Sequence, residues 1–555
     1  MALTASPPRR ARGEGQWALG HREPLNPNER TKKDDNPLHV RDRIETIYAH
    51  RGFASIDPAD LRGRFRWWGL YTQRKPGIDG GRTAVLEPHE LEDEYFMLRV
   101  RVDGGQLDLA QLRTIADIST RYARDTADIT DRQNIQLHWV RIEDMPAIWR
   151  ALESVGLYTT EACGDCPRVI VGSPVAGVAA DEVLDPTPAI REIARRYIGD
   201  PGLSNLPRKF KSTVAWLADV PYEANDIAFI GVDHPDHGPG FDLWVGGGLS
   251  TNPMLAQRLG AWVPLAEVPD VWAAVVGLFR DYGYRRLRHR ARLKFLLADW
   301  GVARFRDVLE NEYLRRKLVD GPAPVLPDKP IDHIGVHRQR DGLSYVGVAP
   351  VVGRVSGTQL AKLADVVESS GSYRVRLTPY QKLLVLDVVD PAPLVEALRG
   401  IGLEAQPSSW RRSTMACTGI EYCKLAIVET KKLAADLVAT LQERLGDLDA
   451  DITINVNGCP NACARTQIAD IGLKGQLVPG PGGELVEGFQ VHLGGGLALA
   501  AGRTAGFGRK LRGLKATADE LPSYVERLAR RYTDDRKPDE AFADWVIRAD
   551  EGLLR

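Results

Sequence analysis

The sequence repeats itself once, and this duplication limits the possible fold more than any other feature. A shift of 248 residues lays the stretch from Asp93 over the stretch from Asp341 without a gap, and it also lays Phe241 on Phe489. Other pairs matched by this shift are Val100 and Val348, Gly105 and Gly353, Gln111 and Gln359, Leu112 and Leu360, Ala116 and Ala364, Asp117 and Asp365, Thr130 and Thr378, Gln133 and Gln381, and residues 246–248 and 494–496. A shared strand and helix pattern built from common residues is the alternative, but one shift that serves such distant matches favours a duplication. We therefore predict two fused copies of about 250 residues, packed about a pseudo-twofold axis as in a symmetric dimer.

The two copies differ in charge and in cysteine content. Arg99 and Arg101 of the first copy fall on Gly347 and Ala349, whereas the paired cysteines lie in the second copy. A site between the halves could therefore take cations from one half and metal ligands from the other. Residues 96–102 alternate in the period of a strand and residues 109–123 follow the period of a helix, which predicts a mixed α+β chain.

Composition argues against several classes of protein. Lys and Arg (73) nearly balance Asp and Glu (74), whereas a dedicated nucleic-acid binder has a strong basic excess. No apolar run approaches the roughly 18 residues that cross a membrane, and residues 1–15 lack the apolar core of a secretory signal. We expect a cytoplasmic chain of several domains that binds neither nucleic acid nor membrane. Residues 1 to about 55 are polar and without clear periodicity, and we expect them to form a flexible extension.

Four of the six cysteines have the spacing of a metal centre. Cys417 and Cys423 form C-x5-C, Cys459 and Cys463 form C-x3-C, and 35 residues separate the two pairs. Four thiolates are what a cubane iron–sulfur cluster requires. Structural zinc is the competing interpretation, but it usually takes shorter loops between its cysteines, and inert buried thiols are the third. The spacing favours an iron–sulfur cluster.

Two further groups of candidate ligands are less specific. Cys163 and Cys166 form an isolated C-x2-C, which could be half of a metal site or a redox pair. Because no second pair lies nearby in the sequence, the interpretation as non-ligands is favoured. The histidines at 234, 237, 333 and 337 lie in loop-like sequence, and we expect all four at the surface.

Several cations occur at spacings that would place them together. Lys209 and Lys211 lie two residues apart, as do Arg99 and Arg101, so each pair would point to one side of an extended strand. Arg168 follows the C-x2-C turn. Each of these could be a solvated surface charge. Brought together, they would form an anion pocket, because Arg and Lys stabilise oxyanions strongly once water is excluded.

The cysteine and cationic segments together resemble a known family. CTGIEYC at 417–423 with NGCPNAC at 457–463 resembles the siroheme and 4Fe-4S signature of assimilatory sulfite and nitrite reductases. RWWGLY at 66–71 is similar to the ferredoxin-dependent members, and the remaining matches are FMLRVR at 96–101, TDRQNIQ at 130–136, LPRKFK at 206–211 and RARLK at 290–294. The resemblance runs from about residue 50 to 545, and the ferredoxin-dependent sulfite reductases are the most similar subgroup.

The resemblance implies a fold and a set of boundaries. It implies an α+β, internally duplicated, pseudo-twofold fold with two ferredoxin-like half-domains and two siroheme- and cluster-binding halves. The expected segments are an extended N-terminal region at 1–80, the first ferredoxin-like half-domain at 81–155, the first siroheme and anion-site half at 156–325, the second ferredoxin-like half-domain at 326–405 and the cluster-binding half at 406–555.

The resemblance also implies roles for individual residues. Cys417, Cys423, Cys459 and Cys463 would hold the 4Fe-4S cluster, with Cys463 also bridging to the siroheme iron. Arg99, Arg168, Lys209 and Lys211 would form the anion pocket and supply protons. The positions expected to contact siroheme, whose eight carboxylates would accommodate many cations, are Arg101, Thr130, Arg132, Gln136 and Asn461. Cys163 is a candidate thiol near this site, where it would be open to oxidation or covalent modification.

The implied activity is the six-electron reduction of sulfite to sulfide in sulfur assimilation, by a monomer that takes electrons from reduced ferredoxin. Lys211 favours sulfite, because the nitrite-reducing members more often have Asn there, and Arg101 favours it where the nitrite type tends to Lys. A more cationic pocket also suits the sulfite dianion better than the nitrite monoanion. Ferredoxin-dependent nitrite reduction is the alternative, and a non-catalytic iron–sulfur protein is a more remote one. The basic segment at 285–294 could steer an acidic ferredoxin, face siroheme carboxylates or face solvent.

Overall fold

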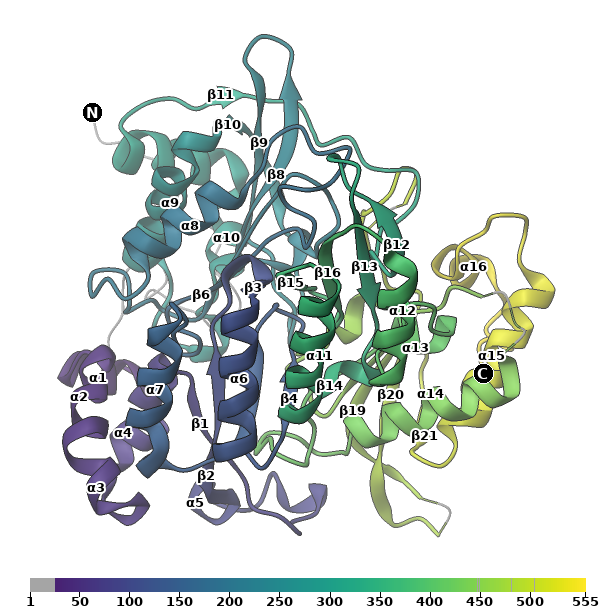
Figure 1. The fold of residues 1–555 in the computed structure, drawn as a ribbon, viewed down its shortest axis with the longest axis horizontal. Coiled ribbons are helices and arrows are strands. Elements are labelled where there is room, and N and C mark those ends of the chain that lie inside the picture. The colour runs from purple at the N-terminus through teal and green to yellow at the C-terminus, as the bar shows by residue number, and fades with distance from the viewer. Residues whose placement is uncertain (1–24, 447, 449, 481, 504) are drawn as a thin grey trace.

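The computed structural model describes residues 25–446, 448, 450–480, 482–503 and 505–555 of the chain, and its described strands form four sheets (Figure 1). Two sheets belong to the ferredoxin-like part. The first has the order β1 (Leu70–Arg74), β2 (Glu92–Val100), β5 (Ile135–Val140), β4 (Ala127–Ile129) and β14 (Arg354–Val355). The second has the order β12 (Gly335–Arg338), β13 (Ser344–Val348), β16 (Leu383–Val388), β15 (Arg374–Leu377) and β3 (Gln106–Asp108).

These two sheets exchange a strand. The short strand β14 of the second half pairs with β4, and its counterpart β3 of the first half pairs with β15. The registers are the same under the shift of 248 residues, since Arg354 faces Asp128 in one sheet and Arg376 faces Gln106 in the other. Each half therefore completes the sheet of the other, which confirms the predicted pseudo-twofold packing of a duplicated chain.

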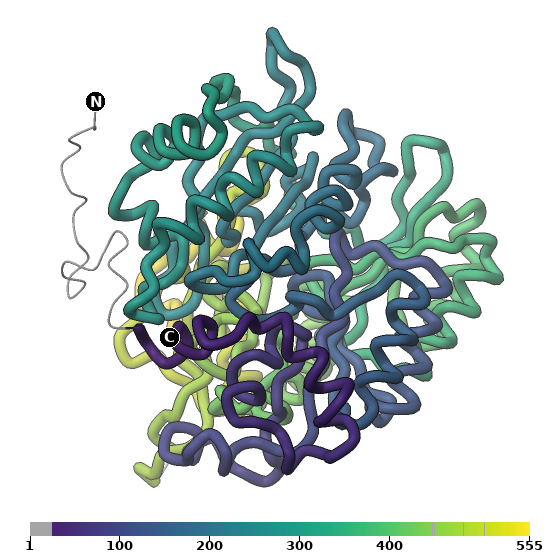
Figure 2. Tube along the Cα trace, turned by 90° about the vertical axis from the view of Figure 1, so that its left-hand side faces the viewer, coloured from purple at the N-terminus to yellow at the C-terminus, as the bar shows by residue number. Residues whose placement is uncertain are grey.

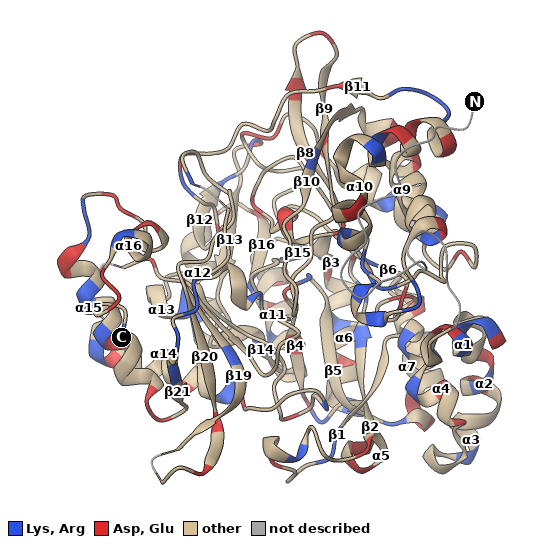
Figure 3. Cartoon of the chain, turned by 180° about the vertical axis from the view of Figure 1, so that it is seen from behind, with Lys and Arg blue, Asp and Glu red and all other residues tan. Residues whose placement is uncertain are grey.

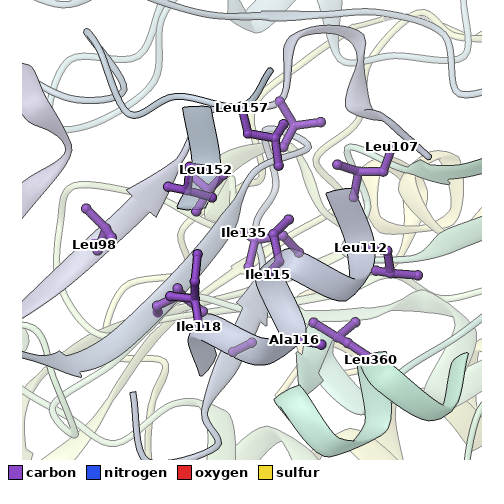
Figure 4. Close-up of a cluster of buried hydrophobic side chains, with 14 of the residues drawn as sticks. Leu98, Leu107, Leu112, Ile115, Ala116, Ile118, Ile135, Leu152, Leu157 and Leu360 are labelled. Atoms are coloured by element: carbon purple, nitrogen blue, oxygen red, sulfur yellow. The ribbon is translucent and has the colours of Figure 1, made fainter. Parts of the chain in front are cut away.

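Two equivalent helices pack against each other at the centre of the molecule. They are α6 (Leu109–Tyr122), which begins at the capping box of Asp108 and Gln111, and α11 (Gly357–Ser369), which begins at Ser356. Buried side chains from both, including Leu112, Ala116 and Leu360, belong to one core cluster that spans the two halves (Figure 4). Burial of such side chains is the main stabilising term in a core, at about 1.5–3 kcal/mol each.

A glycine before each of these helices has the same backbone conformation in both copies. Gly105 and Gly353 both have positive φ angles, 69° and 72°. A Cβ on Gly105 would lie 2.5 Å from the carbonyl oxygen of Leu377, and one on Gly353 would lie 2.8 Å from that of Ile129. Since Ile129 and Leu377 are themselves related by 248 residues, the two close approaches are reciprocal, and only glycine fits either position.

Each of the other two sheets has three neighbouring parallel strands at one edge and antiparallel strands in the rest of the sheet. One has the order β11 (Val319–Asp320), β10 (Gln257–Val263), β9 (Gly238–Val245), β8 (Ile227–His234), β7 (Phe210–Ala215) and β6 (Pro167–Val171). The other has the order β17 (Thr414–Ala416), β18 (Ile454–Asn457), β19 (Ile471–Pro479), β20 (Leu485–Leu493) and β21 (Lys515–Thr517). Helices cover each of them. The larger helices of the first are α8 (Thr187–Tyr197), α9 (Val268–Tyr282) and α10 (Leu293–Val308), and those of the second are α14 (Lys431–Leu445), α15 (Leu521–Asp535) and α16 (Phe542–Arg548).

The N-terminal segment differs from the flexible extension that we expected for residues 1 to about 55. Residues 1–24 lie outside the described residues, but the rest forms short helices (purple in Figures 1 and 2): α1 (Pro27–Asp34), α2 (Val40–Arg43), α3 (Ala49–Arg51) and α4 (Pro58–Arg62). Val40 and Ile44 are fully buried in the central core, and Asn26 Nδ2 donates to the carbonyl of Arg285 at 2.6 Å. Helices this short show too few turns for a period of 3.6 residues to be visible in the sequence.

The remaining described helices are α5 (Pro88–Leu91), α7 (Met145–Ser154), α12 (Pro391–Gly400) and α13 (Ser409–Ser413). Among the described residues, no helix is both long enough and apolar enough to span a bilayer. Segments with Lys and Arg are interspersed with segments with Asp and Glu over the elements seen in Figure 3, and the formal net charge of the chain is -1.

Candidate functional site

The four paired cysteines lie on two loops that leave neighbouring parallel strands. Cys417 follows β17 directly, and Cys459 lies two residues after β18. Because β17 and β18 are parallel and in register at Ala416 and Val456, both loops begin at the same edge of the sheet. The topology therefore brings together two clips that are 35 residues apart in the sequence.

The four thiols form one electrostatic group. Burial raises the pKa of Cys417, Cys423 and Cys459, and the charge of neighbouring thiolates raises each further, so that every one of the six pairs among the four cysteines interacts. Backbone N–H groups oppose this: Gly458 N donates to Cys417 Sγ at 3.2 Å, and the amides of Ala426 and Asn461 lower the pKa of Cys423 and Cys459. Four thiolates that repel one another need a cationic centre, and N–H donors to sulfur are typical of iron–sulfur sites.

Across the described residues, no three His, Cys, Asp or Glu side chains converge closely enough to hold a single metal ion. The donor set, its mutual repulsion and its N–H donors thus fit a 4Fe-4S cluster on Cys417, Cys423, Cys459 and Cys463.

Lys209 and Lys211 lie beside this cluster site. Lys211 begins β7 after Phe210, and Lys209 precedes the strand. Both lysines interact with Cys463, which joins the cationic strand of the first half to the cysteine loop of the second. Burial lowers the pKa of Lys211 to about 8 and places that of Lys209 well below its usual value, with repulsion between the two as a further cause for Lys209. Within the described part of the chain, neither ammonium has a hydrogen-bond partner.

Arg132 and Arg168 extend the same cationic pocket. Arg132 donates from Nη1 to Asn225 Oδ1 at 2.8 Å and from Nη2 to the carbonyl of Val169 at 2.7 Å, while its Nε is buried without a partner among the described residues. Burial lowers the pKa of Arg132 to about 9, with repulsion from Arg168 among the further causes. The Arg168 guanidinium donates hydrogen bonds to the backbone carbonyls of Gly164 and Ala162. An orphaned buried donor in a cluster of mutually repelling cations fits a polyanionic group such as siroheme.

Arg99 and Gln136 face each other across β2 and β5, and they reach the second half. Arg99 Nη2 donates to Gln136 Oε1 at 2.7 Å, and Gln136 Nε2 donates to Thr418 Oγ1 at 3.2 Å. Arg99 Nη1 also lies 2.9 Å from Cys163 Sγ. The structure thus places the buried Cys163 thiol at the edge of the cationic pocket, against a guanidinium.

Two of the predicted siroheme contacts, Arg101 and Thr130, are held by partners within the protein, whereas a third, Asn461, is exposed. Arg101 is buried, pairs with Asp103 at 2.8 Å and donates to the carbonyls of Glu161, Pro167 and Arg168. Thr130 Oγ1 accepts the backbone N–H groups of residues 132 and 134 and so shapes the turn that carries Arg132, as Thr378 does in the other half. Asn461 lies exposed on the loop between Cys459 and Cys463. Arg101 and Thr130 therefore hold the backbone of the segments that carry Arg168 and Arg132.

The basic segment at 285–294 differs from a solvent-facing patch. Arg285 pairs with Glu29, Arg288 pairs with Asp165, and the Lys294 ammonium is buried among three backbone carbonyls. Arg292 pairs with Asp226 at 2.7 Å, and the same carboxylate oxygen accepts the backbone N–H of Lys211 at 2.8 Å. Most of this segment is therefore internal, and Arg292 and Asp226 hold the Lys211 strand in place.

Sequence reasoning did not assign Tyr71, Arg208 or Asp226 to the site. Tyr71 lies on β1, and burial together with the neighbouring Cys163 raises its pKa. Arg208 repels Lys209, and burial lowers the pKa of Arg208 itself to about 10. Tyr71 lies in the motif at 66–71 and Arg208 in the motif at 206–211, so both could have been found from those motifs. No sequence motif indicated Asp226, because its role depends on the pairing of β7 and β8.

A duplicated α+β chain in which four cysteines lie beside a group of buried and half-buried cations is typical of an iron–sulfur oxidoreductase that acts on a small anion. Comparison with known proteins agrees. The family model described as the nitrite and sulphite reductase 4Fe-4S domain matches residues 163–318 and 408–551, and that of the nitrite/sulfite reductase ferredoxin-like half domain matches residues 89–155 and 337–398. The chain belongs to the nitrite and sulfite reductase family, whose cofactors are siroheme and a 4Fe-4S cluster.

Individual relatives match all or nearly all of the chain. A curated sulfite reductase (ferredoxin) of Mycobacterium tuberculosis is 62% identical over 100% of both chains. An assimilatory ferredoxin-dependent nitrite reductase of Haloferax mediterranei is 34% identical, over 91% of this chain and 89% of the relative. A solved structure of the Mycobacterium tuberculosis NirA protein superposes with a TM-score of 0.95 at 62% identity, covering 98% of this chain and 100% of that one.

Proposed function

We propose that the chain is a cytoplasmic, monomeric, ferredoxin-dependent sulfite reductase of sulfur assimilation. The observation that carries the proposal is the pair of lysines beside Cys463. Lys209 and Lys211 are half-buried, repel each other and have no hydrogen-bond partner within the described chain. Ionisable groups left in this condition mark functional sites, and an oxyanion is the ligand that would satisfy them. The 62% identity to a sulfite reductase (ferredoxin), against 34% to a nitrite reductase, supports sulfite as the substrate.

The protein's groups divide into proton donors and fixed charges. When bound, siroheme and the cluster supply the iron that takes the anion and the route for six electrons. Lys211, whose pKa burial lowers to about 8, can release a proton near neutral pH to a departing oxygen. Arg168 stays charged, because a guanidinium has a very high pKa and its neighbours, Asp165 among them, keep that pKa above its usual value despite burial, and so it can hold negative charge throughout. Arg99 and Arg132 complete the pocket, and we propose that Arg132, with Gln136 and Asn461, contacts the siroheme.

The lysine pair also sets the preference between substrates. Two ammonium groups stabilise a dianion more than a monoanion, because the Coulomb energy scales with the product of the charges. Replacing Lys211 by Asn removes one of these charges and leaves Lys209 alone. We expect sulfite reduction to suffer more than nitrite reduction.

The test is anaerobic turnover of siroheme-loaded protein with reduced ferredoxin, comparing kcat/KM for sulfite and nitrite. We expect the wild-type protein to prefer sulfite and Lys211→Asn to lower the sulfite-to-nitrite ratio roughly tenfold or more, the effect of one lost charge-assisted hydrogen bond. Lys362→Asn, an exposed position on α11, is the matched control and should leave the ratio unchanged. A preference of the wild-type protein for nitrite would overturn the substrate, and absence of turnover with either anion would overturn the catalytic proposal.

A further inference from the structure

A cavity of about 630 Å³ lies where the two halves meet, away from the cysteine loops. Its walls come from the turn before α6 and from α8 of the first half, and from β15 of the second. Five arginines and two aspartates are the charged residues of its lining. The volume is in the range of sites that bind small molecules.

Arg376 of β15 is the buried cation of this cavity. It is 5% exposed, and its Nε has no hydrogen-bond partner among the described residues. It also forms no ion pair within the described chain. Burial, followed by repulsion from Arg374 and Arg191, lowers the pKa of Arg376 to about 10, against the attraction of Asp387 and Asp185. A buried guanidinium without a partner is costly, so its retention calls for a ligand.

The pseudo-twofold axis provides an internal comparison. The counterpart of the Arg376 and Gln106 pair is the pair of Asp128 and Arg354, one residue from each half. There the charges are matched: Arg354 Nε donates to Asp128 Oδ1 at 2.9 Å, and Lys431 approaches the same oxygen at 3.3 Å. In the other copy, Arg376 stands in the place of Asp128 and Gln106 in the place of Arg354, so this pair has no carboxylate. Arg376 lines the cavity instead.

The acidic groups near Arg376 are engaged by other partners. Asp103 accepts from Arg101 Nε and from the Tyr158 hydroxyl, both at 2.8 Å. Asp108 caps α6 through the N–H of Gln111. Asp387 pairs with Arg374, and Asp185 accepts the N–H of Thr187. None of them forms an ion pair with Arg376: Asp387 and Asp185 act on it only from a longer range, so its guanidinium has no directly paired anion among the described residues.

We propose that this cavity binds a tetrahedral oxyanion of the phosphate and sulfate class, held by Arg376 with Arg191 and Arg374, either free or as the end group of a small organic molecule. Arginine forks match such oxyanions in geometry as well as in charge. Room for an organic part is present, because Leu107, Leu157 and Ile190 line the remaining wall and Tyr373 is 58% exposed at its rim. The proposal does not depend on the reductase activity.

The test measures the thermal stability and the affinity of the holoenzyme with inorganic phosphate and, separately, with phenyl phosphate. A ligand that binds only the folded state raises Tm. Phosphate should therefore raise the Tm of the wild-type protein, and phenyl phosphate should raise it too when the cavity accepts the organic group. Arg376→Met should lose this rise and weaken phosphate binding roughly tenfold or more. Without ligand, Arg376→Met should match or exceed the wild-type Tm, because it removes an unpaired buried charge. Arg399→Met, an exposed position on α12, is the control and should behave like the wild-type protein.

Two further measurements separate this cavity from the anion pocket at the cluster. Lys211→Asn should keep the full phosphate effect, since Lys211 does not line the cavity. Binding of phosphate alone would identify a free oxyanion as the ligand, and tighter binding of phenyl phosphate would identify an ester. If phosphate stabilises Arg376→Met as much as the wild-type protein, or stabilises neither, the proposal is overturned.

Discussion

Gln136 and Thr418 join the two halves of the chain at the edge of the cationic pocket, with Gln136 Nε2 donating to Thr418 Oγ1 at 3.2 Å. The same amide accepts a hydrogen bond from Arg99 through its oxygen at 2.7 Å. Thr418 follows Cys417 directly in the sequence. A single side chain therefore fixes a cation of the first half against a cluster ligand loop of the second.

Replacing Gln136 by Leu should lower kcat/KM for sulfite by roughly tenfold while the cluster stays bound. The reason is that Arg99 loses the acceptor that orients its guanidinium, and a hydrogen bond to a charged group contributes about 1.5–3 kcal/mol. Gln136→Glu keeps this acceptor but adds a negative charge beside Arg99, so it should keep the guanidinium in place while weakening the binding of the anion through a higher KM. Turnover measured together with the iron content and the siroheme spectrum checks both. Wild-type kcat/KM in a fully loaded Gln136→Leu protein would contradict the proposed positioning role.

Removing one cluster ligand should release iron without unfolding the rest of the chain. In Cys459→Ser we expect loss of the iron and acid-labile sulfide of the cluster, because a cubane needs one thiolate for each iron. Cys166→Ala is the matched control: Cys166 is also buried, but its Sγ contacts the carbonyl of Cys163 at 2.8 Å. Full iron loss in Cys166→Ala, or full retention in Cys459→Ser, would show that the ligand set is assigned incorrectly.

The duplicated architecture could be predicted because one shift of 248 residues ran through both copies, and reciprocal features such as Gly105 and Gly353 now explain why those positions match. The strand exchange could not be predicted. Strands β3 and β14 have only three and two residues, too few for a period of two to be visible, and their partners lie in the opposite half.

In the candidate site, too, local sequence patterns could be predicted, whereas contacts between distant segments could not. The spacing of Cys417, Cys423, Cys459 and Cys463 indicated a cluster without any tertiary information, and the two loops that carry these cysteines leave the same edge of one sheet. Burial was harder to predict: His333, which we expected at the surface, is 3% exposed and lies between Asp219 and the Tyr345 hydroxyl. Neither partner is near it in the sequence, so no local pattern could have indicated the contact.

The ion pair that joins the exchanged strands should be important for stability. Asp128 is buried and its charge is balanced by Arg354 and Lys431, while His138 Nε2 lies 3.1 Å from its Oδ2. Asp128→Asn would leave these groups without their carboxylate, and breaking a buried pair on one side costs about 3–5 kcal/mol. Asp365→Asn is the control, because Asp365 also pairs across the halves, with Arg113, but its side chain is 66% exposed. There we expect a loss below about 1 kcal/mol. Thermal or denaturant unfolding of both variants measures the difference, and equal losses would contradict it.

Glu161 should make stability fall as the pH rises through neutrality. Its side chain is fully buried: Oε2 accepts the N–H of Gly199 at 3.0 Å, and Oε1 has no partner among the described residues. Burial raises the pKa of Glu161 from 4.5 to about 8. Between these two values the folded state binds a proton that the unfolded state has released. The free energy of unfolding contributed by Glu161 is therefore fully present below pH 4.5 and is lost as the pH rises through about 8.

Glu161→Gln removes this titration while keeping the shape of the side chain and an acceptor for Gly199. The difference in Tm between Glu161→Gln and the wild-type protein should therefore increase in favour of the variant from pH 5 toward pH 8, inside the window set by the two pKa values. Glu443→Gln, at an exposed position on α14, should show no such trend. Because the carbonyl of Glu161 also accepts from Arg101, the variant tests burial of the carboxyl without removing that contact. A difference in Tm that stays constant across the window would mean that Glu161 is already ionised in the folded protein, and that its unpartnered oxygen is stabilised by a group outside the described contacts.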